Sequence, residues 1–87
     1  MRALLKTDTC MYVEKVQSMY SCTFNDVEGL MIVPEVGDLY FIEMPKYMAE
    51  SCIKLLFTEE KIDLTMHTAK LVDEDTNELY DDYLECT

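Results

Sequence analysis

The clearest pattern along the chain is a helical one, over residues 45–60. Apolar side chains recur there at the three- and four-residue spacing of one helix face: Met48, Ala49, Cys52, Ile53, Leu55 and Leu56. On the opposite face, Glu50 precedes Lys54 in the favourable direction for an ion pair one turn apart. Pro45 suits the first helical position, but Met44 before it has no side-chain acceptor for the first turn. We therefore expect packing to hold the start of this helix.

The rest of the chain has the patterns of strands and turns. Two-residue alternation or short apolar runs predict strands at residues 11–17, 19–24, 30–33, 39–44 and 62–72. Residues 3–5 fit either an edge strand or a helical turn. Turn-forming residues follow at 25–29, 37–38 and 73–77. After the last turn, residues 78–84 have the spacing of a short helix, but the apolar residues on both sides of the turn favour a hairpin strand, which we prefer.

The order of these segments predicts an α+β fold. We expect a mainly antiparallel β-sheet of four to six short strands with one amphipathic helix packed on one face, in the order β-β-β-α-β and then a strand or a short helix. The 87 residues, 49% of them hydrophobic, predict a single folded domain over residues 1–87 with an acidic C-terminal segment, residues 71–87.

Negative charge is concentrated in that last segment. The chain has a net charge of −11, and residues 71–87 hold seven acidic residues and no basic one. A field of this sign repels nucleic acid and anionic membranes, and it attracts basic protein surfaces. We therefore expect a basic protein as partner, with no direct binding of nucleic acid and no membrane contact.

The cysteines predict a cytoplasmic protein with reduced thiols. Cys10, Cys22, Cys52 and Cys86 are not preceded by a secretory signal, and no apolar run has the length of a membrane span. No two cysteines have the close spacing of zinc ligands, so we predict no metal site, although pairing or ligation in space stays open.

Two motifs resemble functional sites but lack essential parts. Asp73-x-Asp75-x-Asn77 resembles the start of an EF-hand calcium loop, yet the sixth position is Glu78 where the loop needs glycine, and the twelfth is Leu84 where it needs glutamate. The single histidine, His67, falls on the predicted polar face with Asp63 and Thr65, while Cys22 and Cys52 fall on predicted core faces. With no glycine-rich phosphate loop either, we predict no enzyme and no cofactor.

The acidic segment also carries aromatic residues. Duplex DNA has one charge per about 1.7 Å of its axis, and a strand advances about 3.3 Å per residue, so adjacent acids on a hairpin approach that density within about twofold. Tyrosines among carboxylates add apolar contacts for a partner rich in Arg and Lys. The predicted partner-binding residues are Asp73, Glu74, Asp75, Glu78, Tyr80, Asp81, Asp82, Tyr83 and Glu85.

These features favour a non-enzymatic stoichiometric inhibitor that binds a basic surface of a nucleic-acid-processing protein, such as a nuclease, as a nucleic-acid mimic. In size, acidity and lack of catalytic motifs the chain resembles the small inhibitors that phages and other mobile elements make against host defence nucleases, anti-CRISPR proteins among them. The alternative is a small α+β interaction module or accessory subunit that homodimerises through an edge strand, its acidic end serving only solubility.

Overall fold

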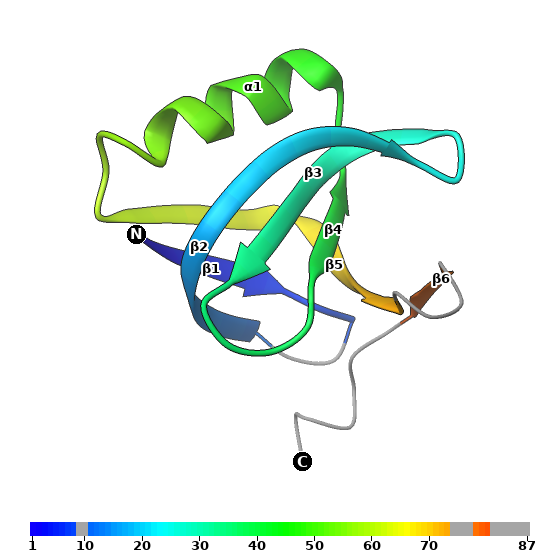
Figure 1. Cartoon of the computed structure of the whole chain (residues 1–87), viewed down its shortest axis with the longest axis horizontal. Coiled ribbons are helices and arrows are strands. Elements are labelled where there is room, and N and C mark those ends of the chain that lie inside the picture. The colour runs from blue at the N-terminus through cyan, green and yellow to red at the C-terminus, as the bar shows by residue number, and fades with distance from the viewer. Residues whose placement is uncertain (9–10, 74–77, 81–87) are drawn as a thin grey trace.

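The computed structural model describes residues 1–8, 11–73 and 78–80 (Figure 1). In chain order its elements are β1 (Arg2–Lys6), β2 (Met11–Phe24), β3 (Val27–Pro34), β4 (Tyr40–Glu43), α1 (Lys46–Leu55), β5 (Lys61–Asp73) and β6 (Glu78–Tyr80). The predicted mainly antiparallel sheet with one helix is therefore confirmed. Four strands precede the helix, where the predicted order β-β-β-α-β gave three.

The strands form a closed ring. Neighbours in the order β1-β2-β3-β4-β5-β6 pair antiparallel, and β1 also pairs parallel with β5. This additional pairing closes the first five strands on themselves, with β6 added beside β5 (Figure 1). Residues 3–5, which fitted an edge strand or a helical turn, belong to a strand that is paired on both sides.

β2 is one long strand where two were expected. Its 14 residues pair first with β1 and then with β3. The register shifts between Val16 and Ser18, so Gln17 is an extra residue of the kind found in a β-bulge. Bulges bend a strand and increase its twist, which allows β2 to pair with β1 before the bulge and with β3 after it. Val16 and Met19 are both buried although they are three positions apart, a spacing that strict alternation would place on opposite faces.

The main core fills the ring beneath the helix. The buried cluster consists of Ala3, Leu5, Val16, Met19, Leu30, Ile32, Tyr40, Ile42, Met44, Ala49, Ile62, Leu64, Ala69 and Leu71. From α1, Ala49 is buried, and Met48, Cys52 and Ile53 pack against the cluster, as does the C-cap residue Leu56. Leu55, which the pattern placed on the apolar face, is exposed at the end of the helix.

No side chain caps the start of α1, and Met44, just before the helix, is buried in the main core. Pro45 is the N-cap residue itself and has an extended backbone, so it does not occupy the first helical position that its sequence context suggested. Its carbonyl oxygen accepts hydrogen bonds from the amides of Met48 and Ala49, at 3.0 and 3.1 Å.

A second apolar cluster lies on the other face of β2, β3 and β4. It contains Phe24, Met31, Phe41 and Val72, with Cys22, Val27 and Leu39 packed against it. Met31 and Phe41 alternate in sequence with Leu30, Ile32 and Ile42 of the main core, so these strands are apolar on both faces. The rings of Phe24 and Phe41 are 5.6 Å apart between centroids, tilted by 38°, a favourable aromatic geometry.

An irregularity in β5 overturns one interpretation of the sequence. Leu4 of β1 pairs with Asp63, but Lys6 pairs with Thr68, so β5 contains extra residues between these points. The buried side chains change from Ile62 and Leu64 to Ala69 and Leu71 across it. The predicted alternation of Ile62, Leu64 and Met66 put Met66 on the apolar face, and this is wrong, because Met66 is 88% exposed.

Candidate functional site

The structure places three of the predicted partner-binding residues. Asp73 ends β5 and lies opposite Glu78 in β6, while Tyr80 pairs with Leu71, so the preferred hairpin strand is confirmed at residues 78–80. Glu74, Asp75, Asp81, Asp82, Tyr83 and Glu85 lie outside the described residues.

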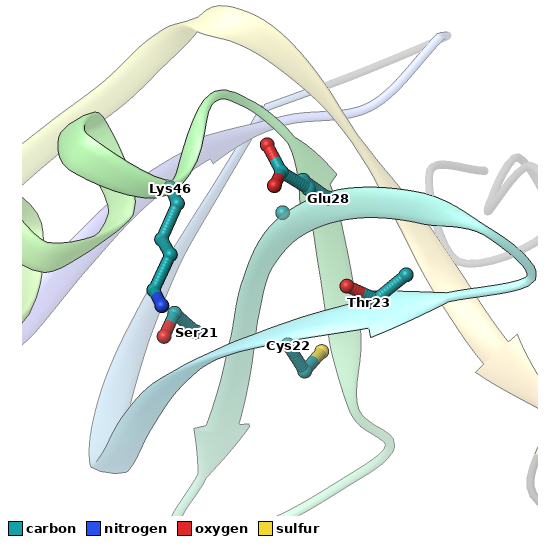
Figure 2. A pocket seen from close by; sticks show the side chains of 6 residues that line it. Ser21, Cys22, Thr23, Glu28 and Lys46 are labelled. Carbon is teal, nitrogen blue, oxygen red and sulfur yellow. The ribbon is translucent and has the colours of Figure 1, made fainter.

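A hollow of about 240 Å³ opens between β2, β3 and the start of α1 (Figure 2). It is lined by Ser21, Cys22, Thr23, Glu28, Gly29 and Lys46. Lys46 comes from the first turn of α1, and its side chain extends toward Ser21 of β2 (Figure 2). The lining therefore offers two hydroxyls, an ammonium and a carboxylate, which suit hydrogen bonding and charge recognition.

The thiol in this hollow is not poised for nucleophilic attack. Partial burial raises the pKa of Cys22 above its ordinary value, and it does the same for Cys52 beneath α1. A raised pKa lowers the fraction of thiolate, the reactive form, at neutral pH. Both thiols are free, and both residues pack against the apolar clusters, as their predicted core faces indicated.

A wider hollow of about 560 Å³ adjoins the first and is lined by Asp26, Val27, Glu28, Glu43, Met44, Pro45 and His67. Glu28 lines both hollows. We call the three carboxylate residues of the wider hollow, Asp26, Glu28 and Glu43, the acidic rim. Among the described residues, no cation forms an ion pair with any of the three, and no group of histidines, cysteines and acids is arranged to hold a metal ion.

Backbone geometry positions the acidic rim. Asn25 and Asp26 have φ values of 50° and 67°, as in the tight turns that join two strands with right-handed twist. This turn places Asp26 at the tip of the β2–β3 hairpin. The amide of Met44 donates to the Glu28 carbonyl oxygen at 3.2 Å, and Gly29 lies opposite Glu43. The end of β4 is thus fixed beside the start of β3, which brings the two glutamates to one place.

His67 differs from its sequence interpretation. The alternation placed it on an exposed polar face with Asp63 and Thr65, but it is partly buried, and its Nε2 atom is buried without a hydrogen-bond partner. The extra residues in β5 are the reason, because they shift the alternation between Asp63 and Thr68. Asp63 instead accepts hydrogen bonds from the Thr65 hydroxyl at 2.6 Å and the Thr65 amide at 2.9 Å.

The acidic rim escaped the sequence analysis because its members are distant in the chain. Asp26 and Glu28 are close together, but Glu43 is fifteen residues beyond Glu28 and joins them only through strand register. The available signals were the turn residues before Glu28 and a single charge at the end of an apolar strand. Neither signal states which strands become neighbours.

No protein-family model, curated protein or solved structure matches this chain. The function must therefore be argued from the residues and their arrangement. In the part of the chain that the structure describes, no helix is long and apolar enough to cross a membrane.

Proposed function

We propose that the chain is a non-enzymatic stoichiometric inhibitor that binds a basic surface of a nucleic-acid-processing protein. The observation that carries this proposal is the acidic rim, a group of three exposed carboxylates that line one hollow and form no ion pair with a described cation, in a chain of net charge −11. Uncompensated charge of one sign in a concave surface speeds association with a partner of opposite charge.

The grouping of the carboxylates supports mimicry of nucleic acid. Glu28 and Glu43, on adjoining strands, line one hollow together with Asp26, so several anionic groups lie on one small area, as they do along a phosphate backbone. The segment 71–87 adds seven further acids and two tyrosines. Together they would present anionic groups and aromatic contacts to a channel built for a phosphate backbone.

Competition with DNA tests the proposal. The partner is first isolated on the immobilised chain from extracts of the source organism, and its affinity is then measured by calorimetry at 50 and 200 mM NaCl. We expect a basic, nucleic-acid-binding partner, at least a tenfold loss of affinity at the higher salt concentration, and displacement by duplex DNA. A partner that binds DNA and this chain simultaneously, or equally well at both salt concentrations, would refute mimicry.

Matched charge variants locate the contact. The triple variant Asp26→Asn, Glu28→Gln, Glu43→Gln removes the acidic rim, and Asp81→Asn, Asp82→Asn, Glu85→Gln removes charge from the C-terminal segment. Each should weaken partner binding at least tenfold. The control is Glu35→Gln, Glu50→Gln, Glu59→Gln, which removes the same net charge from exposed positions that line neither hollow. If all three variants weaken binding equally, binding depends on the net charge of the chain and not on the acidic rim or the C-terminal segment.

A further inference from the structure

The outer face of β1, β2 and β5 carries a row of cations. Arg2 of β1 lies opposite Lys15 of β2 on one side and opposite Lys61 of β5 on the other. All three are exposed. Adjacent strands are about 4.8 Å apart, so three like charges stand side by side across the sheet. Lys6, four positions after Arg2 in β1, lies on the same face. Four of the seven basic residues of this acidic chain are therefore on this face.

Burial shows that the row points outward and has apolar neighbours. Ala3 and Leu5 are in the core, so Arg2, Leu4 and Lys6 face the other way. Leu4 lies opposite Val13, and Lys6 lies opposite Met11; these two β2 side chains are 47% and 64% exposed. We call this surface the basic face: Arg2, Leu4, Lys6, Met11, Val13, Lys15 and Lys61.

The cations of the basic face are not compensated within the described structure. Arg2, Lys6 and Lys15 form no ion pair with any described residue, while Lys61 has Asp63 near it on the same strand. Like charges opposite one another destabilise a sheet. A local excess of positive charge, interleaved with exposed apolar side chains, suits an occupant that is both acidic and apolar.

We propose that the basic face binds residues 81–87 of a second copy of the chain, reciprocally, to form a two-fold dimer. That segment has the complementary chemistry, since Asp81 and Asp82 precede Tyr83 and Leu84, and Glu85 follows them. The dimer goes beyond the proposed function and does not depend on it. It would occupy part of the acidic surface in each copy and so compete with a basic partner.

Chain reach favours a second copy at the cation row. Tyr80 lies opposite Leu71, three residues along β5 from Thr68, which pairs with Lys6, and Arg2 lies four residues before Lys6 in β1. These seven steps along the ladder make a path of about 23 Å. Five residues beyond Tyr80 extend at most about 18 Å, so the backbone of the same chain reaches Lys6 but stops short of the cation row at Glu85. At 0.15 M salt the Debye length is about 8 Å. Salt therefore weakens the long-range repulsion between two acidic molecules more than it weakens the short-range ion pairs at their interface.

Sedimentation velocity of the full chain tests the dimer. We expect a monomer–dimer equilibrium at 0.15 M NaCl and a monomer at 1 M. Arg2→Gln with Lys15→Gln should raise the dimer dissociation constant at least tenfold, as should the triple change at Asp81, Asp82 and Glu85. The control, Lys46→Gln with Lys54→Gln, alters net charge equally on α1 and should change the constant less than twofold. Circular dichroism verifies that each variant folds.

A charge exchange makes the test specific. A chain with Arg2→Glu and Lys15→Glu and a chain with Asp81→Lys and Asp82→Lys should each be monomeric, yet form a heterodimer when mixed. A wild-type chain that stays monomeric at 0.15 M NaCl, a dimer that survives the basic-face changes, or a monomer whose basic face binds a 12-base-pair DNA would each overturn the proposal. Because the partner assay with competing DNA does not require a dimer, these failures leave the proposed function separately testable.

Discussion

The ring of Phe41 lies over the backbone of Gly29, so that a β-carbon on Gly29 would collide with the ring and with the Ile42 carbonyl oxygen. Gly29 lies inside β3, opposite Cys22 on one side and Glu43 on the other. Its sequence context, after Glu28, suggested part of a turn. The glycine is needed instead because Phe41, 1% exposed, crosses that point to reach the second apolar cluster.

Gly29→Ala should therefore destabilise the fold by about 1–3 kcal/mol, the usual cost of overpacking a filled site. Urea denaturation measures it. Phe41→Leu replaces the ring with a shorter side chain. In the double variant with Gly29→Ala it should recover part of the lost stability, because both changes affect the contact between positions 29 and 41.

Gly37→Ala is the matched control, because no atom lies within 4 Å of a β-carbon there. Because Gly37 has a φ of 102°, the loss of stability in Gly37→Ala comes from backbone strain alone and is about 1–2 kcal/mol. Phe41→Leu should leave this loss unchanged. A Gly29→Ala chain as stable as wild type would show that the ring moves aside freely.

The carboxyl of Asp63 should titrate below the ordinary range of aspartate. The hydrogen bond from the Thr65 hydroxyl, then the one from its amide, lowers the pKa of Asp63, with a smaller contribution from Lys61. These bonds favour the charged form, so their contribution to stability is present above the unfolded-state pKa and is lost as pH falls through the folded-state pKa. Thr65→Val should raise the Asp63 pKa, as followed by carboxyl-carbon NMR, whereas Thr65→Ser should keep it low.

The described thiols should react slowly. In a Cys10→Ser, Cys86→Ser background, Cys22 and Cys52 should be alkylated by iodoacetamide at pH 8 more slowly than free cysteine, because burial raises the pKa of both thiols. Unfolding in urea should bring their rates to that of free cysteine. Rapid alkylation of the folded chain at Cys22 would instead indicate an activated thiol in the hollow of Figure 2.

Local features of the fold could be predicted from the sequence, since helix and strand periodicity depend on neighbouring residues. The helix face around Ala49 and the alternation through Ile62 and Leu64 are examples. The parallel pairing of β1 with β5 could not, because it joins Arg2 to Lys61 across most of the chain and leaves no periodic signal. The basic face depends on that pairing, and the acidic rim depends on the equally non-local register of Glu43.

Register shifts account for the remaining errors. Side chains alternate with a period of two, so a single extra residue exchanges the buried and exposed faces of everything beyond it. Gln17 does this in β2, where two expected strands are one. The extra residues after Asp63 do it in β5, where they explain both the exposure of Met66 and the partial burial of His67.

The two methionines Met44 and Met66 give a direct measure of that effect. Both fall on apolar faces by sequence pattern, but Met44 is 3% exposed in the core and Met66 is 88% exposed. Met44→Ala should cost about 2–5 kcal/mol, because it leaves a cavity, whereas Met66→Ala should stay within about 0.5 kcal/mol of wild type. Thermal denaturation of the two variants compares the same chemical change at both sites. Equal losses would mean that β5 continues its alternation without the irregularity after Asp63, and that His67 faces solvent.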